Sequence, residues 1–224
     1  DVNEYELSVA WDVSSASFVD AFSVATQETQ PTGIAFSKSG TKMFILGKAG
    51  DDVNEYTLSV AWDVSSASFV DSFSVASQEI FPTGIAFSKS GEKMFTVGSV
   101  SDDVNEYTLS VAWDVSSASF VDSFSVASQH SFPTGIAFSK SGDKMFIVGS
   151  NGDDVNEYTL TTAWDVSTAS FVDSFSVNSQ ETAPNTIWFD STGKTMFIVG
   201  NAGDDVNVYK LTTAWDVSTA SFVS

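Results

Sequence analysis

The chain has 224 residues, 42% of them hydrophobic, which is enough to bury a sizeable core. It carries 29 acidic and nine basic residues, all nine of them lysine, for a formal net charge of −20. Nucleic acids and anionic membrane surfaces attract basic proteins, so this balance argues against both partners. No run approaches the ~18 apolar residues of a membrane span. Because cysteine is absent, a disulfide framework and a thiolate metal site are excluded.

A tryptophan recurs every 51 residues, and the text around it hardly changes. Each copy lies in a stretch close to DVNEYTLSVAWDVSSASFV, and a second stretch, close to PTGIAFSKSGTKMFILG, repeats between the copies. A fixed period of this kind indicates a repeat architecture in which each unit is one supersecondary structure. The recurring tryptophans are Trp11, Trp62, Trp113, Trp164 and Trp215.

Residues 1–25 hold only the second half of a unit, so we expect them to form a two-stranded hairpin. This hairpin could cap an edge, pair with another chain, or belong to a unit whose first half is missing. Because residue 1 falls inside a unit, we expect the chain to be a piece of a longer protein.

The first complete unit begins at Pro31. Residues 32–37 are short, apolar and typical of a strand. The following segment, 38–41, has turn chemistry, with Gly40 able to adopt a positive φ. Residues 42–46 form a continuous apolar run, which predicts a strand that is covered on both faces.

The second half of the unit predicts two more strands. Residues 52–58 form the third, and the connection 59–66 holds the tryptophan. The fourth strand, 68–75, alternates so that Phe69 and Phe73 share one side, which predicts an outer strand that is half exposed.

Four short strands per unit, without helical periodicity, are typical of a β-propeller blade, an all-β fold with antiparallel sheets. A β-solenoid and an open array of four-stranded sheets are the alternatives. Four blades are few for a closed ring, so closure by oligomerisation is a further expectation. The predicted complete blades are 31–75, 82–126, 133–177 and 184–224, the last expected as a terminal or capping blade.

Residues 133–149, PTGIAFSKSGDKMFIVG, are followed by DVNEYTL at 154–160. This text resembles YVTN/lactonase-like and NHL-type propeller repeats. The resemblance covers all four units and implies the fold without implying one function. The tandem text is more loosely similar to repeats in surface or tail proteins of marine bacteria and phages.

Differences between units gather in two loops, one before each proline and one after each second strand. Strand direction alternates, so we predict that both loops lie on one face, where rigid scaffolds usually carry binding sites. Neutral drift at loop tips is the alternative. The candidate ligand-binding residues in these loops are Glu28, Gln30, Lys48, Glu79, Phe81, Ser99, His130, Phe132, Asn151, Glu181 and Asn201.

Trp188 is a further candidate, because it replaces the alanine that other units have in the innermost strand. It either caps a terminal unit or lines a central pocket, and capping is the preferred interpretation. For the recurring tryptophans we prefer packing between units to sugar stacking. His130, the only histidine, is expected to be an incidental surface residue, so no catalytic residue is predicted.

Acidic groups recur before the third strand, and oxygen ligands this dense suit Ca²⁺. The spacing matches no EF-hand loop, and the last unit has Val208 where the others have glutamate. Turn formation is therefore preferred, with a calcium site as the alternative. The candidate ligands are Asp51, Asp52, Asn54, Glu55, Asp102, Asp103, Asn105, Glu106, Asp153, Asp154, Asn156 and Glu157.

We expect a non-enzymatic propeller that acts in recognition, adhesion or assembly through the loops of one face. Its expected partner is a protein, a glycan or further copies of itself, and its expected location is extracellular, at a cell surface or on a virion. No cofactor other than Ca²⁺ is considered. The alternatives are a small-molecule-binding, lactonase-like propeller enzyme and a purely structural array.

Overall fold

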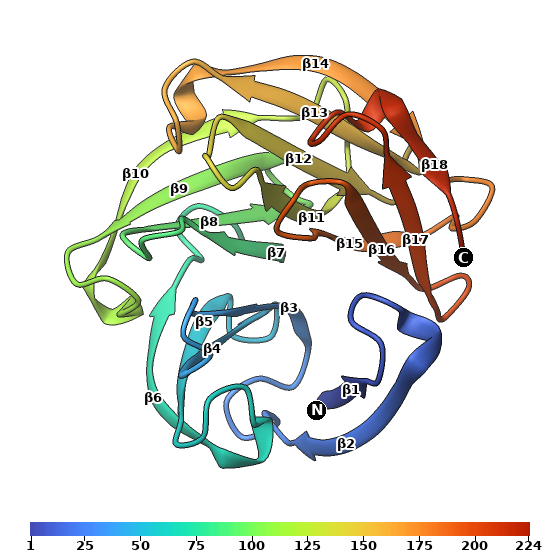
Figure 1. Ribbon diagram of the computed structural model, residues 1–224. Helices are drawn as coiled ribbons and strands as arrows, with labels where there is room; N and C mark the ends of the chain where they lie inside the picture. The colour runs from blue at the N-terminus through green and yellow to red at the C-terminus, as the bar shows by residue number, and fades with distance from the viewer.

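The computed structural model describes all residues, 1–224, as five antiparallel sheets arranged in a ring (Figure 1). Four sheets have four strands each and the fifth has two, so the predicted all-β fold of four blades plus a hairpin is confirmed. The half-blade comprises β1 (Val2–Leu7) and β2 (Ala16–Phe22). Blade 1 comprises β3 (Pro31–Phe36), β4 (Lys42–Gly47), β5 (Asp52–Leu58) and β6 (Ala67–Ser74).

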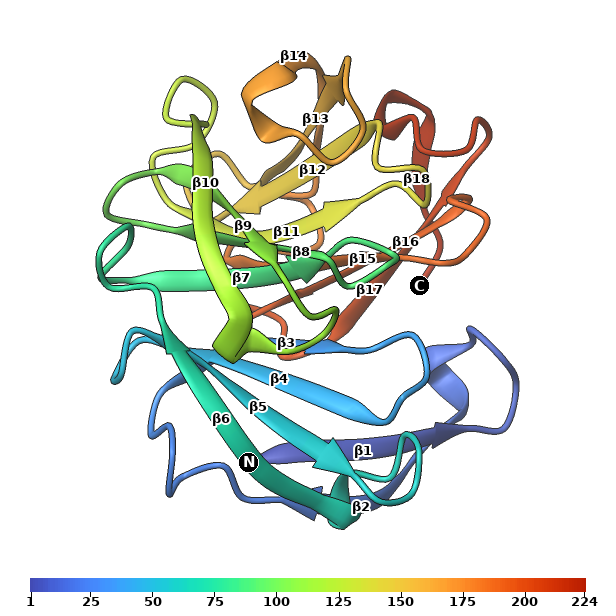
Figure 2. The same ribbon diagram turned by 90° about the vertical axis from the view of Figure 1, so that its left-hand side faces the viewer.

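The other three blades repeat this order of strands. Blade 2 comprises β7 (Pro82–Phe87), β8 (Lys93–Gly98), β9 (Asp103–Leu109) and β10 (Ala118–Ser125). Blade 3 comprises β11 (Pro133–Phe138), β12 (Lys144–Gly149), β13 (Asp154–Leu160) and β14 (Ala169–Ser176). Blade 4 comprises β15 (Pro184–Phe189), β16 (Thr195–Gly200), β17 (Val206–Leu211) and β18 (Ala220–Phe222). Figure 2 views the ring from its side, with β6 and β10 toward the viewer.

The core lies between neighbouring blades, and the second strand of each blade supplies much of it. In β8 every residue after Lys93 is buried, as the continuous apolar run predicts. The third strand, β9, is buried at Val104, Tyr107 and Leu109. Each sheet is therefore packed through its second and third strands against the two neighbouring blades.

The outer strands are exposed as predicted, but the alternation predicted for them is wrong. A bulge near Val70 shifts the register, so that Phe69 pairs with Tyr56 and Asp71 pairs with Glu55. Phe69 consequently packs on Tyr56 of its own blade, whereas Phe73 packs on Tyr107 of the next blade. The two phenylalanines thus contact different blade interfaces.

Each third-to-fourth connection contains one short 3₁₀ helix. In blade 1, Asp63 caps this helix by accepting a hydrogen bond from the Ser65 amide at 3.0 Å. None of the five helices has the length or apolarity needed to cross a membrane. They are η1 (Val13–Ser15), η2 (Val64–Ser66), η3 (Val115–Ser117), η4 (Val166–Thr168) and η5 (Val217–Thr219).

The repeated tryptophan folds back onto the turn between the first two strands of its own blade. Trp62 has a φ of 69°, and its amide donates to the Gly40 carbonyl at 2.9 Å. Gly40 has a φ of 70°, and a Cβ there would lie 2.3 Å from the indole. Glycine is therefore required in this turn for both its backbone conformation and the close approach of the ring.

From this position the indole reaches the neighbouring blade. Trp113 of blade 2 lies 5.3 Å from Phe87 of its own blade and 6.1 Å from Phe44 of blade 1, measured between ring centroids. Trp164 and Trp215 repeat the arrangement at the next two interfaces. These tryptophans pack between units, as the sequence predicts.

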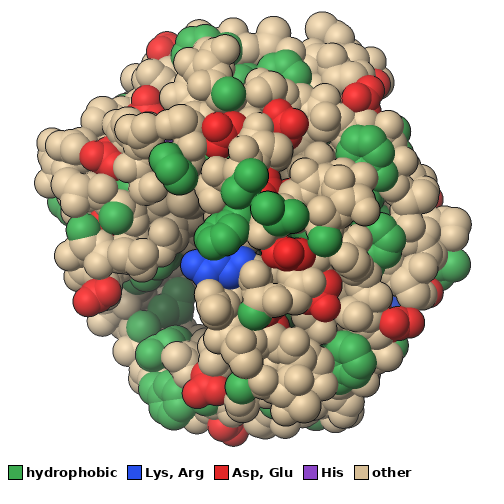
Figure 3. Space-filling model, turned by 180° about the vertical axis from the view of Figure 1, so that it is seen from behind, with side chains coloured by type: hydrophobic (Ala, Val, Ile, Leu, Met, Phe, Trp, Pro, Cys, Tyr) green, Lys and Arg blue, Asp and Glu red, His purple; other side chains and the backbone are tan.

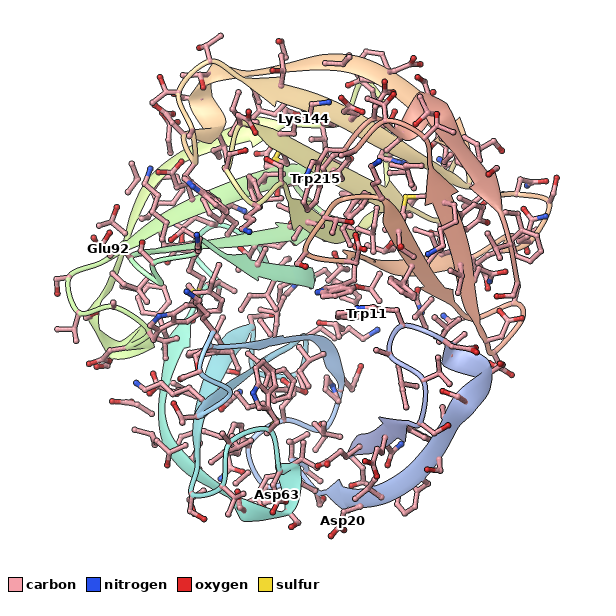
Figure 4. All side chains as sticks on the ribbon, viewed as in Figure 1. Trp11, Asp20, Asp63, Glu92, Lys144 and Trp215 are labelled. Atoms are coloured by element: carbon pink, nitrogen blue, oxygen red, sulfur yellow. The ribbon has the colours of Figure 1, made fainter.

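An ion pair within one blade also connects that blade to the next. Lys93 Nζ lies 2.6 Å from Glu106 Oε1 and also donates to the Trp164 carbonyl of blade 3 at 2.7 Å. The other carboxylate oxygen of Glu106 accepts from the Val166 amide at 3.0 Å. The pairs Lys42–Glu55 and Lys144–Glu157 repeat this bridge, and Lys144 and Trp215 are labelled in Figure 4. Blade 4 has Thr195 and Val208 at the two positions, so both partners are lost together.

The N-terminal hairpin occupies the place of the outer half of a fifth blade. On one side, Glu4 accepts from the Val64 amide of blade 1 at 3.0 Å, as Glu106 does from Val166. On the other side, Trp11 lies 6.3 Å from Phe197 of blade 4. Figure 4 shows Trp11 near the middle of the ring. The hairpin therefore contacts both blade 4 and blade 1.

Candidate functional site

A depression of about 640 Å³ lies on the ring axis, on the face where the innermost strands begin. Figure 3 shows the molecule from behind, with a basic side chain near the centre of the face, hydrophobic side chains above it and an acidic side chain to its right. Lys48 is the only charged residue in the lining, although the chain carries a net charge of −20. The lining residues are Gln30, Pro31, Thr32, Lys48, Phe81, Thr83, Ser99, Phe132, Thr134, Asn185 and Asn201.

Six of the predicted ligand-binding residues meet in this depression, and they come from both variable loops, so the prediction that the two loops share one face is confirmed. Phe81 and Phe132 are 45% and 52% exposed, so both rings are open to a ligand. Lys48 Nζ lies 5.2 Å from the centre of the Phe81 ring, within cation–π distance. The six are Gln30, Lys48, Phe81, Ser99, Phe132 and Asn201.

A ring of threonines that sequence reasoning missed lies in the same lining. Thr32 donates to the Pro82 carbonyl of the next blade at 2.8 Å, and Thr83 and Thr134 repeat the bond. Blade 4 has Asn185 instead, whose amide donates to Asn201 at 2.7 Å. The exchange of threonine for asparagine in one unit of four is a signal that the sequence already contained.

Glu28, Glu79 and Glu181 do not lie at the surface, and the expectation that they are exposed on the loop face is wrong. All three are at most 2% exposed. Glu79 accepts from the Phe81 amide at 2.7 Å and the Ser101 amide at 3.1 Å, which joins the two variable loops. A Cβ on Gly98 would lie 2.1 Å from the Glu79 side chain, so glycine provides the space for it. These carboxylates shape the depression from beneath.

His130 takes the place of this glutamate in blade 3 and is likewise buried, so its predicted surface position is also wrong. Its Nδ1 lies 3.3 Å from the Asn151 carbonyl and its Nε2 lies 3.1 Å from Asp154 Oδ1. Asn151 itself is exposed but bonds to Ser131 and is not part of the lining. The contact of His130 Nδ1 links the loop before β11 to the loop that follows β12.

Carboxylates crowd together beneath the loops. Burial, with the nearby charges of Glu79 and Glu28, raises the pKa of Asp51 above its ordinary value. Burial, Glu79 and Asp103 likewise raise the pKa of Asp102, while His130 acts in the opposite direction. For Glu181, burial acts to raise the pKa, but the amides of Ala183, Gly203 and Ala202 donate to the carboxylate and hold its pKa below 4.5.

Replacing Glu181 with glutamine should make the protein less stable by about 1–2 kcal/mol at neutral pH, because the charged acceptor of three amides is lost. The folded-state pKa is depressed, so this stabilisation is present above the ordinary value of 4.5 and is lost as pH falls through the folded pKa. The difference from the parent should therefore shrink as pH is lowered from neutral to values below 4.5. Urea unfolding at neutral pH and along this acidic range measures it, with exposed Glu92→Gln as the control. A difference that is constant with pH would contradict this assignment.

The candidate calcium ligands do not converge, since no three acidic or histidine side chains form a group that could hold a metal. Glu55, Glu106 and Glu157 point into the ion pairs with lysine instead. Asn54 donates to Asp52 at 2.7 Å, and Asn156 donates to Asp154 at 3.2 Å. The first aspartate of each group, Asp51, Asp102 and Asp153, adopts a φ of 50° to 53°, as suits a turn. Asp103 and Asn105 belong to the same strand start in blade 2.

Trp188 does not lie in the loop-face depression. It lines an apolar cavity of about 490 Å³ at the other end of the axis, with Trp62 and the ends of the innermost strands. Its ring stacks on Trp11 of the half-blade at 5.1 Å. Trp188 therefore both lines a central cavity and contacts the N-terminal hairpin.

No family model and no curated protein matches the sequence. Similar solved structures include a functionally unknown protein from Desulfotomaculum acetoxidans, at TM-score 0.59 and 14% identity over 99% of this chain and 62% of that one. A periplasmic gluconolactonase of Pseudomonas aeruginosa has TM-score 0.55 and 14% identity, over 85% of this chain and 52% of the other. A structure of a nidogen/laminin complex has TM-score 0.57 and 14% identity, over 87% and 64%. The chain thus spans about half to two thirds of these proteins. At such identities the likeness is one of β-propeller fold alone.

Proposed function

We propose that the protein is a non-enzymatic recognition module that binds a glycan in the loop-face depression. The observation that supports this is the lining: two exposed phenylalanine rings, amide and hydroxyl groups, one lysine and no carboxylate. Aromatic faces stack on the apolar faces of sugar rings, while amides and hydroxyls pair with sugar hydroxyls. An anionic sugar would also be tolerated here, because Lys48 is the only charge in the lining.

The depression is also held in shape before any ligand arrives. Buried Glu79 joins the loop that carries Phe81 to the loop that follows β8, and the threonines tie the innermost strands together. Preorganised loops reduce the entropy that binding has to overcome. We further propose that the module acts at a cell or virion surface, which rests on the loose similarity of its tandem repeats.

A glycan array probed with the labelled protein tests the proposal. Phe81→Ala with Phe132→Ala should weaken binding to any hit by about tenfold or more, since each stacked ring contributes ~1 kcal/mol. The matched control is Phe171→Ala on β14, which is 45% exposed but lies outside the depression. An array without hits, or hits that the control weakens equally, would count against glycan binding at this site. Lys48→Gln separates anionic glycans, which it should weaken, from neutral ones.

A lactonase-like enzyme is the second candidate, because one similar structure is a gluconolactonase. Acid–base catalysis needs a titratable group at the substrate, and Lys48 is the only such group in the lining. Hydrolysis of a sugar lactone that substitutions in the depression abolish would favour this candidate over glycan recognition.

A further inference from the structure

The ring has one position that its own chain leaves half empty. Blades 1 to 4 each have two inner strands, whereas the half-blade has only β1 and β2, which pair with each other. Cavities of about 710, 490 and 390 Å³ meet around Ile34 where the two inner strands of a fifth blade would lie. We call this space the slot; it is bounded by β1, by β3 of blade 1 and by Trp188 of blade 4.

Side chains beside the slot are exposed where their counterparts are buried. Tyr5 on β1 is 57% exposed, whereas the corresponding tyrosine of each complete blade is fully buried. Ile34 on β3 is 46% exposed, whereas its counterparts in blades 2 to 4 are 3–7% exposed. Ile34 is exposed because no inner strands of the half-blade cover it, whereas Tyr5 additionally lacks a phenylalanine of the preceding blade, such as the one that Phe73 provides for Tyr107.

Two polar groups at the slot also lack the partner that their counterparts have. Glu4 accepts from the Val64 amide, but no lysine pairs with it. The Trp62 carbonyl receives no lysine either, whereas Lys42, Lys93 and Lys144 each bond both a glutamate of their own blade and a tryptophan carbonyl of the next. A lysine on the second strand of an incoming hairpin would reach both.

Trp188 occupies part of the slot, beside Trp11 and Phe197. In the three regular interfaces, a phenylalanine from the first strand of the next blade lies 5.1–5.3 Å from the tryptophan of that blade. At the slot, Trp188 lies 5.1 Å from Trp11 and 5.6 Å from Phe197, so the indole takes the place of that phenylalanine. A hairpin that enters the slot must therefore carry a small residue at this position.

We propose that the slot is an acceptor for the inner-strand hairpin of a further copy of the 51-residue unit, with a small residue in place of the phenylalanine that corresponds to Phe138. The hairpin pairs with the free edge of β1, covers Tyr5 and Ile34, and places its lysine between Glu4 and the Trp62 carbonyl. Charge matches, because the second strands of blades 1 to 3 carry this lysine in the corresponding place, and shape matches once the residue that corresponds to Phe138 is small.

The test appends residues 123–149 after Ser224, which continues the register of the repeat because Ser224 corresponds to Asp122. The appended copy carries Phe138→Ala. Amide hydrogen exchange in β1 should slow by about tenfold or more at the amides that point away from β2, since they gain strand partners. Lys144→Met in the appended copy should reduce this protection. Unchanged exchange in β1 would overturn the proposal.

Varying the size of two side chains, at position 138 of the appended hairpin and at Trp188 of the protein, tests the role of Trp188. With Trp188 present, the appended hairpin with alanine at 138 should protect β1 about tenfold better than the hairpin with phenylalanine. In the Trp188→Ala protein the preference should reverse, because the phenylalanine then has space beside Trp11. If phenylalanine and alanine hairpins protect β1 equally in both proteins, the assignment of Trp188 to this place is wrong.

Discussion

Glu106→Ala should lower the free energy of unfolding by about 3 kcal/mol, because it leaves two groups without a partner. The buried Val166 amide loses its acceptor, and Lys93 loses the carboxylate 2.6 Å from its Nζ. The lysine side chain is 31% exposed, so water compensates part of the loss on that side. Urea unfolding of the variant measures the difference, with exposed Glu92→Ala as the control.

Blade 4 provides a matched comparison, since it has threonine and valine where the other blades have the ion pair. Lys93→Thr with Glu106→Val copies that arrangement into blade 2. The double variant should be more stable than Glu106→Ala alone, because no lysine then remains without its carboxylate. If the changes in the free energy of unfolding caused by Lys93→Thr and by Glu106→Val simply add in the double variant, the lysine and the glutamate act independently, contrary to the geometry.

Trp164→Ala should cost about 3 kcal/mol, whereas Trp62→Ala should cost about 1 kcal/mol. Trp164 packs against Phe95 of the preceding blade and Phe138 of its own. Trp62 has only Phe36 of its own blade at 5.6 Å and is 54% exposed, because the half-blade has no second strand. Both residues have positive φ, so the backbone contribution cancels in the comparison.

Thermal and urea unfolding of the two tryptophan variants measure this difference. Equal costs would mean that the contact with the glycine turn, which both indoles make, determines their contribution. A larger cost for Trp164 would mean that the aromatic cluster between blades is a main source of cohesion in the ring. The same comparison reports on the slot, since a hairpin that fills it should also cover Trp62.

Local features were predicted well, because each depends on a few neighbouring residues. The apolar run Met43–Leu46 indicates a strand buried on both faces, and Gly40 indicates a turn with positive φ. The alternation in β6 misled, because the bulge at Val70 shifts the register and no residue there marks it. The position of Glu79 was mispredicted for another reason: its burial depends on the space left by Gly98 at the end of β8, which is a later part of the chain.

By itself, the sequence determined the repeat, the four strands of each blade and the shared face of the two variable loops. These follow from periodicity and from the alternating direction of antiparallel strands, which are local properties. Only the tertiary structure decided that the positions of Thr195 and Val208 hold ion-pair partners in the other blades, that Glu181 lies beneath the loops, and that Trp188 stacks on Trp11. Each of these depends on which blade lies next to which, and the ring places the first residues of the chain beside the last blade.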